Sequence, residues 1–483
     1  MDTSKTLDSK VFGTEVEHGV TFVPDKGETK KLLFAALAGM VVNEVNTLGL
    51  PTAHGDSSNY DFFLWNGARL YVDYGHRIEY STPECDNIVE LVAHEKAGER
   101  ILADLCRRVE VRLRDLGYNG KIHLYKNNSA MGERGKYVSW GWHGNILIPN
   151  NNSWKNLSKD MIAFYVVRTL LAGRGAYVPT DEDNPIEPHI EISDRARFFN
   201  TSFGADSMEN RAIFYYRDEP WADKKRFRRN HDIVADSNMS EYATALKMAT
   251  TLMAFGMIER GIFPRVTLIA PDKALKDISR DLTLSEYVET ADGRKTALEI
   301  LRGYYEIAKA SSFLQELPDP FMRERLLPML EDCLSGLENL ASKPLALFGK
   351  LDWITSKYIL EAARKKKSDK PWQETADDEL REYSRIYPTG SYEQLVERDR
   401  SNNNNGKVPV IKRVCTDADI ENAMKNPPQT TRAVERVRLM TENPNIIRMT
   451  WGEIRVSTAT GIENYRSYDP RVPEFRLSCS EYY

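Results

Sequence analysis

The sequence predicts an α+β fold made of a large domain and a small C-terminal domain. Strand-like segments concentrate before residue 150, whereas long helical patterns dominate the middle of the chain. Residues 401–406 place four asparagines before a glycine, a composition typical of linkers. We therefore expect a large α+β domain over residues 1–405 and a small α/β domain over residues 406–483.

The composition is that of a globular protein. The chain has 483 residues, of which 41% are hydrophobic and 28% charged, and this excludes disordered, collagen-like and coiled-coil proteins. The formal charge of −5 supplies no net positive field, so we expect neither nucleic acid nor membrane as a partner. Five scattered cysteines without a Cys-x-x-Cys pair argue against a disulfide framework and a structural zinc site. With a polar N-terminus and no apolar run long enough to span a bilayer, a cytoplasmic protein is expected.

Hydrophobic periodicity justifies the elements of the first half. Between residues 66 and 75, polar side chains such as Arg69 and Asp73 alternate with apolar ones such as Leu70 and Val72, which predicts a strand. Apolar residues recur at near-helical spacing between residues 86 and 116, and Gly117 ends that pattern, which predicts a long amphipathic helix. The elements expected in this half are strands over residues 11–22, 61–74, 121–125 and 137–148, and helices over residues 30–48 and 86–116.

Helical patterns fill most of the second half. One runs from residue 232 to residue 260 and is stopped by Gly261 and Pro264. Another, over residues 282–316, is interrupted only by Gly293. The elements expected here are helices over residues 161–172, 232–260, 282–316, 322–341 and 351–366, followed beyond the linker by a strand over residues 408–414, a helix over residues 417–425, a second helix and terminal strands.

Several common catalytic motifs are absent from the sequence. There is no G-x-x-x-x-G-K-[ST] phosphate loop and no G-x-S-x-G nucleophile elbow. His94 and Glu95 begin like a zinc-protease helix, but Gly98 stands where the second histidine would be required. The sequence therefore excludes the most common nucleotidase, hydrolase and metalloprotease mechanisms.

Two glutamates on the first predicted strand suggest a cation site. Glu15 and Glu17 are two residues apart, so in an extended strand their side chains point to the same face. Two carboxylates placed in this way repel each other, and a hard divalent cation such as Mg²⁺ relieves that repulsion. The alternative is a solvent-exposed face on which each glutamate is simply hydrated.

A second predicted strand repeats this arrangement. Arg69, Tyr71 and Asp73 share one face, and Glu79 follows six residues later. Acids that hold Mg²⁺ and arginines that neutralise phosphate charge are what phosphoryl transfer requires. An ordinary antiparallel strand with one wet face is the alternative.

Two further arginines have acidic neighbours in the sequence. Arg195 follows Asp194, and Arg217 precedes Asp218. A guanidinium in this setting binds phosphate or carboxylate groups of a substrate, or else forms a structural ion pair. The residues alone leave both interpretations open.

Taken together, the motifs resemble those of the Pup ligase and depupylase family, whose members share a glutamine-synthetase-like fold. The similar segments follow one another in order along most of the chain. They are residues 13–17, 66–73, 79–85, 126–128, 217–220, 236–241 and 427–433. The resemblance implies a curved antiparallel sheet that forms a cradle, packed by helices, and a C-terminal domain that completes a nucleotide site.

The resemblance also implies an activity and a set of site residues. Ligases of this family use ATP to phosphorylate the C-terminal glutamate of the small protein Pup and then join it to a lysine of a target protein. The implied cofactors are ATP and Mg²⁺, and the implied partners are a Pup-like modifier, lysine-bearing targets and, indirectly, the bacterial proteasome. By position, Asp73 would be the catalytic base, Glu15, Tyr71, Glu79 and Glu17 would face Mg²⁺, and Arg69, Thr82, Trp451 and Arg217 would contact ATP.

The length of one segment favours a ligase over a depupylase. Depupylases carry a long insertion before the second acidic strand, whereas here only residues 49–63 fill that space. Residues 13–17 and 83–85 look more like those of a depupylase. A deamidase or isopeptidase of the same fold, a small-molecule carboxylate–amine ligase and a non-catalytic binding protein remain alternatives.

The chain departs from the family pattern at a few positions. Gly144 stands where a glutamate is expected, which predicts one acidic contact fewer in the cradle. Tyr215, Tyr216 and Trp221 replace smaller polar residues. These departures favour a modifier that is similar to Pup rather than identical to it.

Overall fold

The structure, a computed structural model, confirms the predicted α+β class. It describes residues 10–28, 30–131, 137–150, 154–178, 189–206, 210–216, 219–367 and 411–478. Its centre is an eight-stranded sheet in the order β14-β9-β1-β5-β4-β3-β2, with β6 paired to the far half of β1, and neighbouring strands in it run antiparallel. The strands are β1 (Phe12–Pro24), β2 (Thr52–His54), β3 (Asp61–Leu64), β4 (Arg69–Asp73), β5 (Arg77–Ser81), β6 (Gly120–Tyr125), β9 (Trp142–Pro149) and β14 (Phe227–Asp232).

The segment predicted as one strand over residues 61–74 is a hairpin. β3 and β4 are antiparallel, and Phe62 lies opposite Leu70. The turn between them contains Gly67 at a φ of 82°, a left-handed conformation that glycine adopts without strain. The Asn66–Gly67 pair is thus a turn signal that interrupts the alternation.

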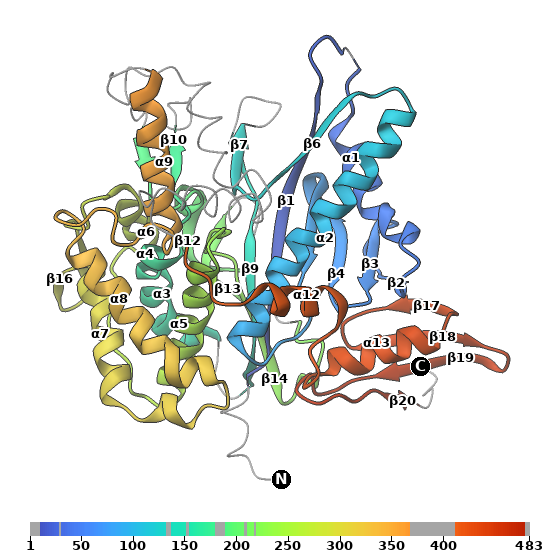
Figure 1. The fold of residues 1–483 in the computed structure, drawn as a ribbon. Helices are drawn as coiled ribbons and strands as arrows, with labels where there is room; N and C mark the ends of the chain where they lie inside the picture. The colour runs from blue at the N-terminus through green and yellow to red at the C-terminus, as the bar shows by residue number, and fades with distance from the viewer. Residues whose placement is uncertain are drawn as a thin grey trace.

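Helices cover the sheet and build two hydrophobic clusters. The first half of α2 packs into a large cluster together with α3 and α5, and its second half packs into a smaller cluster with α1. From Glu241 to Ile258, α5 is buried on all sides, so it is the central helix of the large cluster. The helices are α1 (Phe34–Asn43), α2 (Ile88–Asp115), α3 (Trp154–Val167), α4 (Thr169–Ala172), α5 (Glu241–Glu259), α6 (Pro271–Arg280), α7 (Ala297–Ala310), α8 (Leu326–Glu338) and α9 (Asp352–Lys367). In Figure 1, α7 and α8 lie together on one side of the sheet, while α1 and α2 lie on the other side of the molecule.

The predictions of long helices over residues 232–260 and 282–316 are wrong in part. Residue 232 is the last of β14, and the helix begins only after Ser240, whose hydroxyl accepts a hydrogen bond from the Ala243 N–H. Residues 287–296 form a hairpin of β15 (Tyr287–Thr290) and β16 (Gly293–Thr296). The alternating burial along β15 is a strand pattern, and α7 starts beyond it at a capping box.

Several short strands were not predicted, because three to six residues give too little periodicity to recognise. In addition, the predicted strand over residues 137–148 is divided into β8 and β9. β8 is Tyr137–Ser139, and the unexpected strands include β7 (Ser129–Met131), β10 (Ala176–Val178), β11 (His189–Glu191), β12 (Phe199–Gly204) and β13 (Arg211–Tyr215). The turn predicted near residues 132–135 lies outside the described residues.

The C-terminal part contains a four-stranded antiparallel sheet and two helices. The predicted helix over residues 417–425 is confirmed as α12 (Asp417–Lys425), whereas residues 411–414 form no strand and residues 408–410 lie outside the described residues. α12 packs on α2, and β17 lies beside β2 (Figure 1). The other elements are α13 (Arg432–Glu442), β17 (Ile446–Met449), β18 (Glu453–Thr458), β19 (Gly461–Arg466) and β20 (Arg476–Ser478).

The predicted domain boundary at residues 405 and 406 lies outside the described residues and stays a prediction. Hydrophobic side chains of the C-terminal sheet form a third cluster that also includes Ala53 and Phe63 of the large sheet. Within the part of the chain that the structure describes, no helix combines the length and apolar character needed to cross a membrane.

The contact between α2 and β5 leads to a prediction about stability. A Cβ at Gly98 would lie 2.3 Å from the ring of Tyr80, which is itself almost fully buried. We expect Gly98→Ala to lower the free energy of unfolding by about 2 kcal/mol, because overpacking a closed core forces it apart.

Gly303 of α7 provides a matched control, since the nearest atom to a Cβ there lies 3.8 Å away. Gly303→Ala is expected to stabilise the protein by roughly 0.5–1 kcal/mol through helix propensity. Denaturant unfolding of both variants measures the difference, and equal effects of the two substitutions would contradict the close packing of α2 on β5.

Candidate active site

Strand register brings the predicted acidic residues together. In β1 and β5, Glu17 lies opposite Glu79, and in β4 and β5, Tyr71 lies opposite Glu79. Directly opposed residues point to the same face of a sheet, so these side chains share a face with Glu15 and Asp73, two residues away along their strands. The two acidic strands predicted from sequence are thus parts of one site.

Glu17, Asp73 and Glu79 form the centre of this site. One carboxylate oxygen from each lies within 4.8 Å of those of the other two. Glu79 is 2% exposed, and its Oε1 atom has no hydrogen-bond partner among the described residues. A buried acceptor without a donor is costly, so this arrangement is suited to a bound cation.

The pKa values of these groups reflect their crowding. Burial, followed by the charges of Glu15, Glu17 and Asp73, raises the pKa of Glu79 well above its usual range. Burial also raises the pKa of Glu17, and Asp73 adds to it against the opposing charge of His143. A divalent cation reverses these shifts, because it stabilises the ionised form of each carboxyl.

Tyr71 joins the carboxylate cluster through its phenol. Burial and the negative charge of Glu79 raise the pKa of Tyr71 well above 10, so the phenol stays protonated and donates a hydrogen bond to Glu79. Oxygen ligands of this kind are the ones that Mg²⁺ prefers. The residues present therefore fit the predicted Mg²⁺ site.

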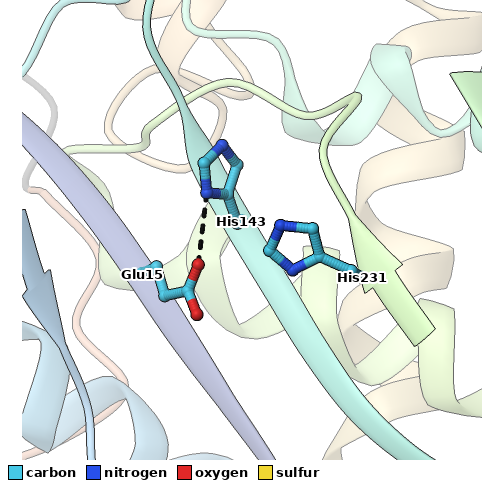
Figure 2. A group of neighbouring side chains, drawn as sticks. All are labelled: Glu15, His143 and His231. Atoms are coloured by element: carbon cyan, nitrogen blue, oxygen red, sulfur yellow. Dashed lines mark hydrogen bonds and ion pairs between the residues drawn. The ribbon is translucent and has the colours of Figure 1, made fainter. Parts of the chain in front are cut away.

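A second group on the same face contains two histidines. Glu15, His143 and His231 each present a ligand atom within 4.8 Å of those of the others, from β1, β9 and β14 respectively (Figure 2). His143 Nδ1 lies 3.3 Å from Glu15 Oε2, and the two imidazole rings are 5.0 Å apart. Imidazole nitrogens together with a carboxylate form a donor set that also accepts transition metals.

Hydrogen bonds orient the second histidine. Asn145 Oδ1 lies 2.7 Å from Arg229 Nη1, which can only donate, and 2.8 Å from His231 Nδ1. Since the amide oxygen accepts from both, His231 Nδ1 carries a proton. An imidazole fixed in this way has the second-sphere support typical of metal ligands.

The charge around Glu15 differs from that around Glu79. Burial alone would raise the pKa of Glu15. The hydrogen bond from His143 and the charges of His231 and Arg229 outweigh burial and hold this pKa well below its usual range. Glu15 is thus ionised while Glu79, across the same face, favours its protonated form. The site keeps one carboxylate charged before any ligand arrives.

The structure corrects the expectation for Gly144. A Cβ at this position would lie 2.9 Å from the ring of Trp142 and 3.5 Å from Met248, on the face opposite to His143. A glutamate there would point into the core. The glycine therefore does not remove an acidic contact from this cradle.

The predicted ATP contacts lie at different parts of the site. Arg69 shares a face with Tyr71, but its guanidinium binds both oxygens of Asp61, at 2.8 and 2.6 Å. Thr82 is buried, and its hydroxyl accepts a hydrogen bond from the Thr14 N–H. Arg217 lies outside the described residues.

A cleft lies between β1 and the C-terminal part of the chain. Glu15 and Thr82 line one part of it, and Trp451 lines another, so the structure brings these distant positions to one cavity. Trp451 packs edge to face against Phe63, with 5.1 Å between ring centroids, and Arg436 lies 4.9 Å from its ring centre. An acidic end and an aromatic end suit a ligand that has phosphates and a base.

Comparison with known sequences identifies the family. The sequence pattern of the family described as Pup-ligase protein matches residues 10–455. The chain belongs to the Pup-ligase family.

Relatives within the Pup-ligase family match over nearly their full length. The Pup--protein ligase of Acidimicrobium ferrooxidans is 34% identical over 439 residues, which cover 90% of this chain and 89% of the relative. That of Nocardioides sp. is 34% identical over 482 residues, with 96% and 98% covered.

Solved structures show the same fold. The complex between the prokaryotic ubiquitin-like protein Pup and its ligase PafA matches with a TM-score of 0.81 and 27% identity, covering 98% of this chain and 90% of that one. The Pup ligase PafA in complex with ADP matches with a TM-score of 0.74 and 27% identity, covering 94% of each chain. The resemblance and the fold class predicted from the sequence are confirmed.

Sequence reasoning missed His143, His231 and Asn145. The available signal was the alternating burial along β9, which turns residues 143 and 145 to the carboxylate face. His231 lies just before the predicted helix over residues 232–260, in a segment for which no strand was predicted. Only the pairing of β9 with β14, in which His231 lies opposite Asn145, shows the group.

The carboxylate cluster yields a prediction about metal binding. Because its folded-state pKa is raised, Glu79 lowers the stability of the metal-free protein as pH rises above the ordinary carboxyl range. Mg²⁺ must displace that proton, so the rise in Tm that 5 mM Mg²⁺, roughly a saturating concentration, produces is expected to be larger at pH 8 than at pH 6.

Glu79→Gln is expected to remove most of this Mg²⁺-dependent rise and its pH dependence, while the metal-free protein gains stability at pH 8. Glu286→Gln, at an exposed position, serves as the control and keeps the wild-type response. Differential scanning calorimetry with Mg²⁺ or EDTA measures both effects, and an unchanged Mg²⁺ response in Glu79→Gln would exclude this carboxyl as a ligand.

Proposed function

We propose that the chain is an ATP-dependent ligase that phosphorylates the C-terminal glutamate of a Pup-like protein and joins it to a target lysine. The observation that carries the proposal is the position of Asp73. This carboxylate belongs to the cation-binding cluster, yet it is the last residue of β4, next to Tyr74, which is 78% exposed. A group at such an edge can meet a nucleotide from one side and a protein substrate from the other.

The relatives support this proposal. Both bacterial proteins described above are Pup--protein ligases, and the similar structures are a ligase bound to Pup and a ligase bound to ADP. Their names agree with the ligase predicted from the short segment over residues 49–63. No feature of the site favours the depupylase, the small-molecule ligase or the binding protein that the sequence left open.

Mg²⁺ fits the carboxylates and the phenol of the site. Glu15, Glu17, Tyr71 and Glu79 would hold it, and when bound it neutralises phosphate charge during transfer. The buried Oε1 atom of Glu79 supports this assignment, because only a cation or a donor satisfies it.

ATP would lie along the cleft described above. Thr82 and Trp451 line the cleft, and Arg69 and Arg217 are the further residues proposed to contact ATP. Arg69 would have to share its guanidinium with Asp61, whose two oxygens it already binds. Since a guanidinium has five donors, its remaining N–H groups can serve the nucleotide.

The proposed reaction has two steps. A glutamate carboxylate oxygen of the modifier attacks the γ-phosphorus of ATP, the bond to the β-phosphate oxygen breaks, and ADP leaves. The lysine nitrogen then bonds to the carbonyl carbon of the acyl phosphate, the carbon–oxygen bond to phosphate breaks, and inorganic phosphate leaves. Asp73 accepts the proton that the amine loses, which it does only when the amine is desolvated and held in position.

The cellular setting belongs to the same proposal. The partners are a Pup-like modifier and lysine-bearing proteins, the reaction takes place in the cytoplasm, and the conjugates reach the bacterial proteasome. The proposed domains are residues 1–405, which carry the acids, and residues 406–483, which supply Trp451 to the cleft. The third hydrophobic cluster, shared between Phe63 and the C-terminal sheet, supports a contact that positions this tryptophan.

The role of Asp73 leads to a test of the function. Asp73→Asn keeps the size of the side chain and removes its ability to accept a proton. We expect the rate of conjugate formation with Pup, ATP and Mg²⁺ to fall by about 10²–10⁴-fold, with ATP binding retained. The conjugate is measured by mass spectrometry on a lysine-bearing target.

Asp25→Asn, in an exposed turn after β1, is the matched control and should conjugate like the wild type. Conjugation by Asp73→Asn at the wild-type rate would remove the base from the proposed mechanism. Failure of the wild-type protein to form any conjugate, with ATP present, would contradict the ligase function itself.

A further inference from the structure

Trp221 occupies an unusual position in the cleft. Its backbone has a φ of 48°, a left-handed conformation that is rare for a bulky side chain and costs about 1–3 kcal/mol. Its side chain is 38% exposed, and the residue lines the same cleft as Trp451. A strained backbone that presents a large ring to a ligand cavity indicates a function for that ring.

The surrounding contacts hold this backbone in place. The carbonyl of Trp221 accepts a hydrogen bond from the guanidinium of Arg432. A Cβ at Gly452 would lie 2.8 Å from the same carbonyl oxygen, so the chain next to Trp451 approaches it closely. Further along, the Asp223 N–H donates to the Tyr468 carbonyl at 2.9 Å. The segment that carries Trp221 is therefore held by contacts with α13 and with the loops beside β18 and β19.

One carboxylate connects the two tryptophans. Glu84 accepts from Arg432 Nε at 2.7 Å and from Arg436 Nη2 at 2.7 Å. Arg432 binds the carbonyl of Trp221, and Arg436 lies over the ring of Trp451. Glu84 and two buried arginines thus fix both aromatic residues relative to the segment that follows β5.

The cleft has both acidic and aromatic lining residues, which suggests how a nucleotide would be oriented in it. Glu15 lines the cleft and shares a sheet face with the carboxylate cluster, so it marks the part where a cation and phosphates would lie. The two tryptophans and Pro220 mark an aromatic and apolar part of the same cleft. A nucleotide whose phosphates meet the cation places its base among these rings, because every base has a π-face that stacks on aromatic side chains.

We infer that Trp221 is a base-contacting residue, which together with Trp451 binds the purine of the nucleotide. The inference rests on the proposed use of ATP and adds a residue and a subsite to it. Stacking contributes affinity without distinguishing one base from another, so Trp221 supports ATP and GTP alike. Selection between the purines must come from polar groups elsewhere in the cleft.

The test measures nucleotide affinity in the full chain. Isothermal titration calorimetry with ATP is expected to show a Kd about 5- to 100-fold weaker for Trp221→Ala, the loss typical of one stacked base, and a similar loss for GTP. Trp221→Phe, which keeps an aromatic ring, should stay within about threefold of wild type. Tyr287→Ala, at an exposed ring in β15, is the matched control and should bind like wild type.

Inorganic tripolyphosphate provides the decisive comparison, because it has the phosphates of ATP and no base. Its affinity is expected to be the same in wild type and Trp221→Ala. Unchanged ATP affinity in Trp221→Ala, or equal losses for ATP and tripolyphosphate, would overturn the inference while the ligase function stands. Absence of ATP binding by the wild-type protein would overturn both.

Discussion

Mutual repulsion among carboxylates on one sheet face is the constraint on which the rest of the site depends. Register places Glu17 directly opposite Glu79, and Asp73 completes the group within 4.8 Å. Like charges directly opposite each other destabilise a sheet, and burial makes this worse. The fold tolerates the arrangement because Glu79 favours its protonated form and because Asp73 is the last residue of β4. A cation bound to the cluster would relieve the remaining repulsion.

Neighbouring charges give two glutamates of the site opposite pKa shifts. Glu15 lies beside His143, His231 and Arg229, which keep it ionised, whereas Glu79 faces other carboxylates and favours its protonated form. The two positions are on adjacent strands and are both buried on folding. Their difference comes from β9 and β14, which bring cationic groups to one flank of β1. The same residue type thus serves as a permanent charge at one position and as a cation-dependent charge at the other.

Much of the fold and part of the site could be predicted from local periodicity. Two-residue spacing placed Glu15 with Glu17 and Tyr71 with Asp73, because strand geometry alone fixes which side chains share a face. It could not place His143 with His231, since that contact depends on a strand pairing between segments far apart in sequence, for one of which no strand was predicted. The ion pair of Arg69 with Asp61 depends on the hairpin of β3 and β4. The strand-like pattern over residues 61–74 predicts one continuous strand, so this pair could not be predicted.

Glu84 shows how the cleft is preformed. Burial would raise the pKa of Glu84, but Arg436 and Arg432 hold it at about 2, so this carboxylate is ionised at physiological pH. Its charge is matched by two guanidiniums of α13, and therefore the attachment of α13 to the segment that follows β5 needs neither nucleotide nor metal. Trp451 and the backbone of Trp221 are positioned by the same pair of arginines. A ligand entering this cleft meets walls that are already ordered, and little of its binding energy is spent on arranging them. Glu79 and Glu84 thus have complementary roles. Within the described part of the chain, Glu79 has no cationic partner beside it and would pair with a bound cation, whereas Glu84 is paired with two arginines and fixes the part of the cleft where the rest of the ligand would lie.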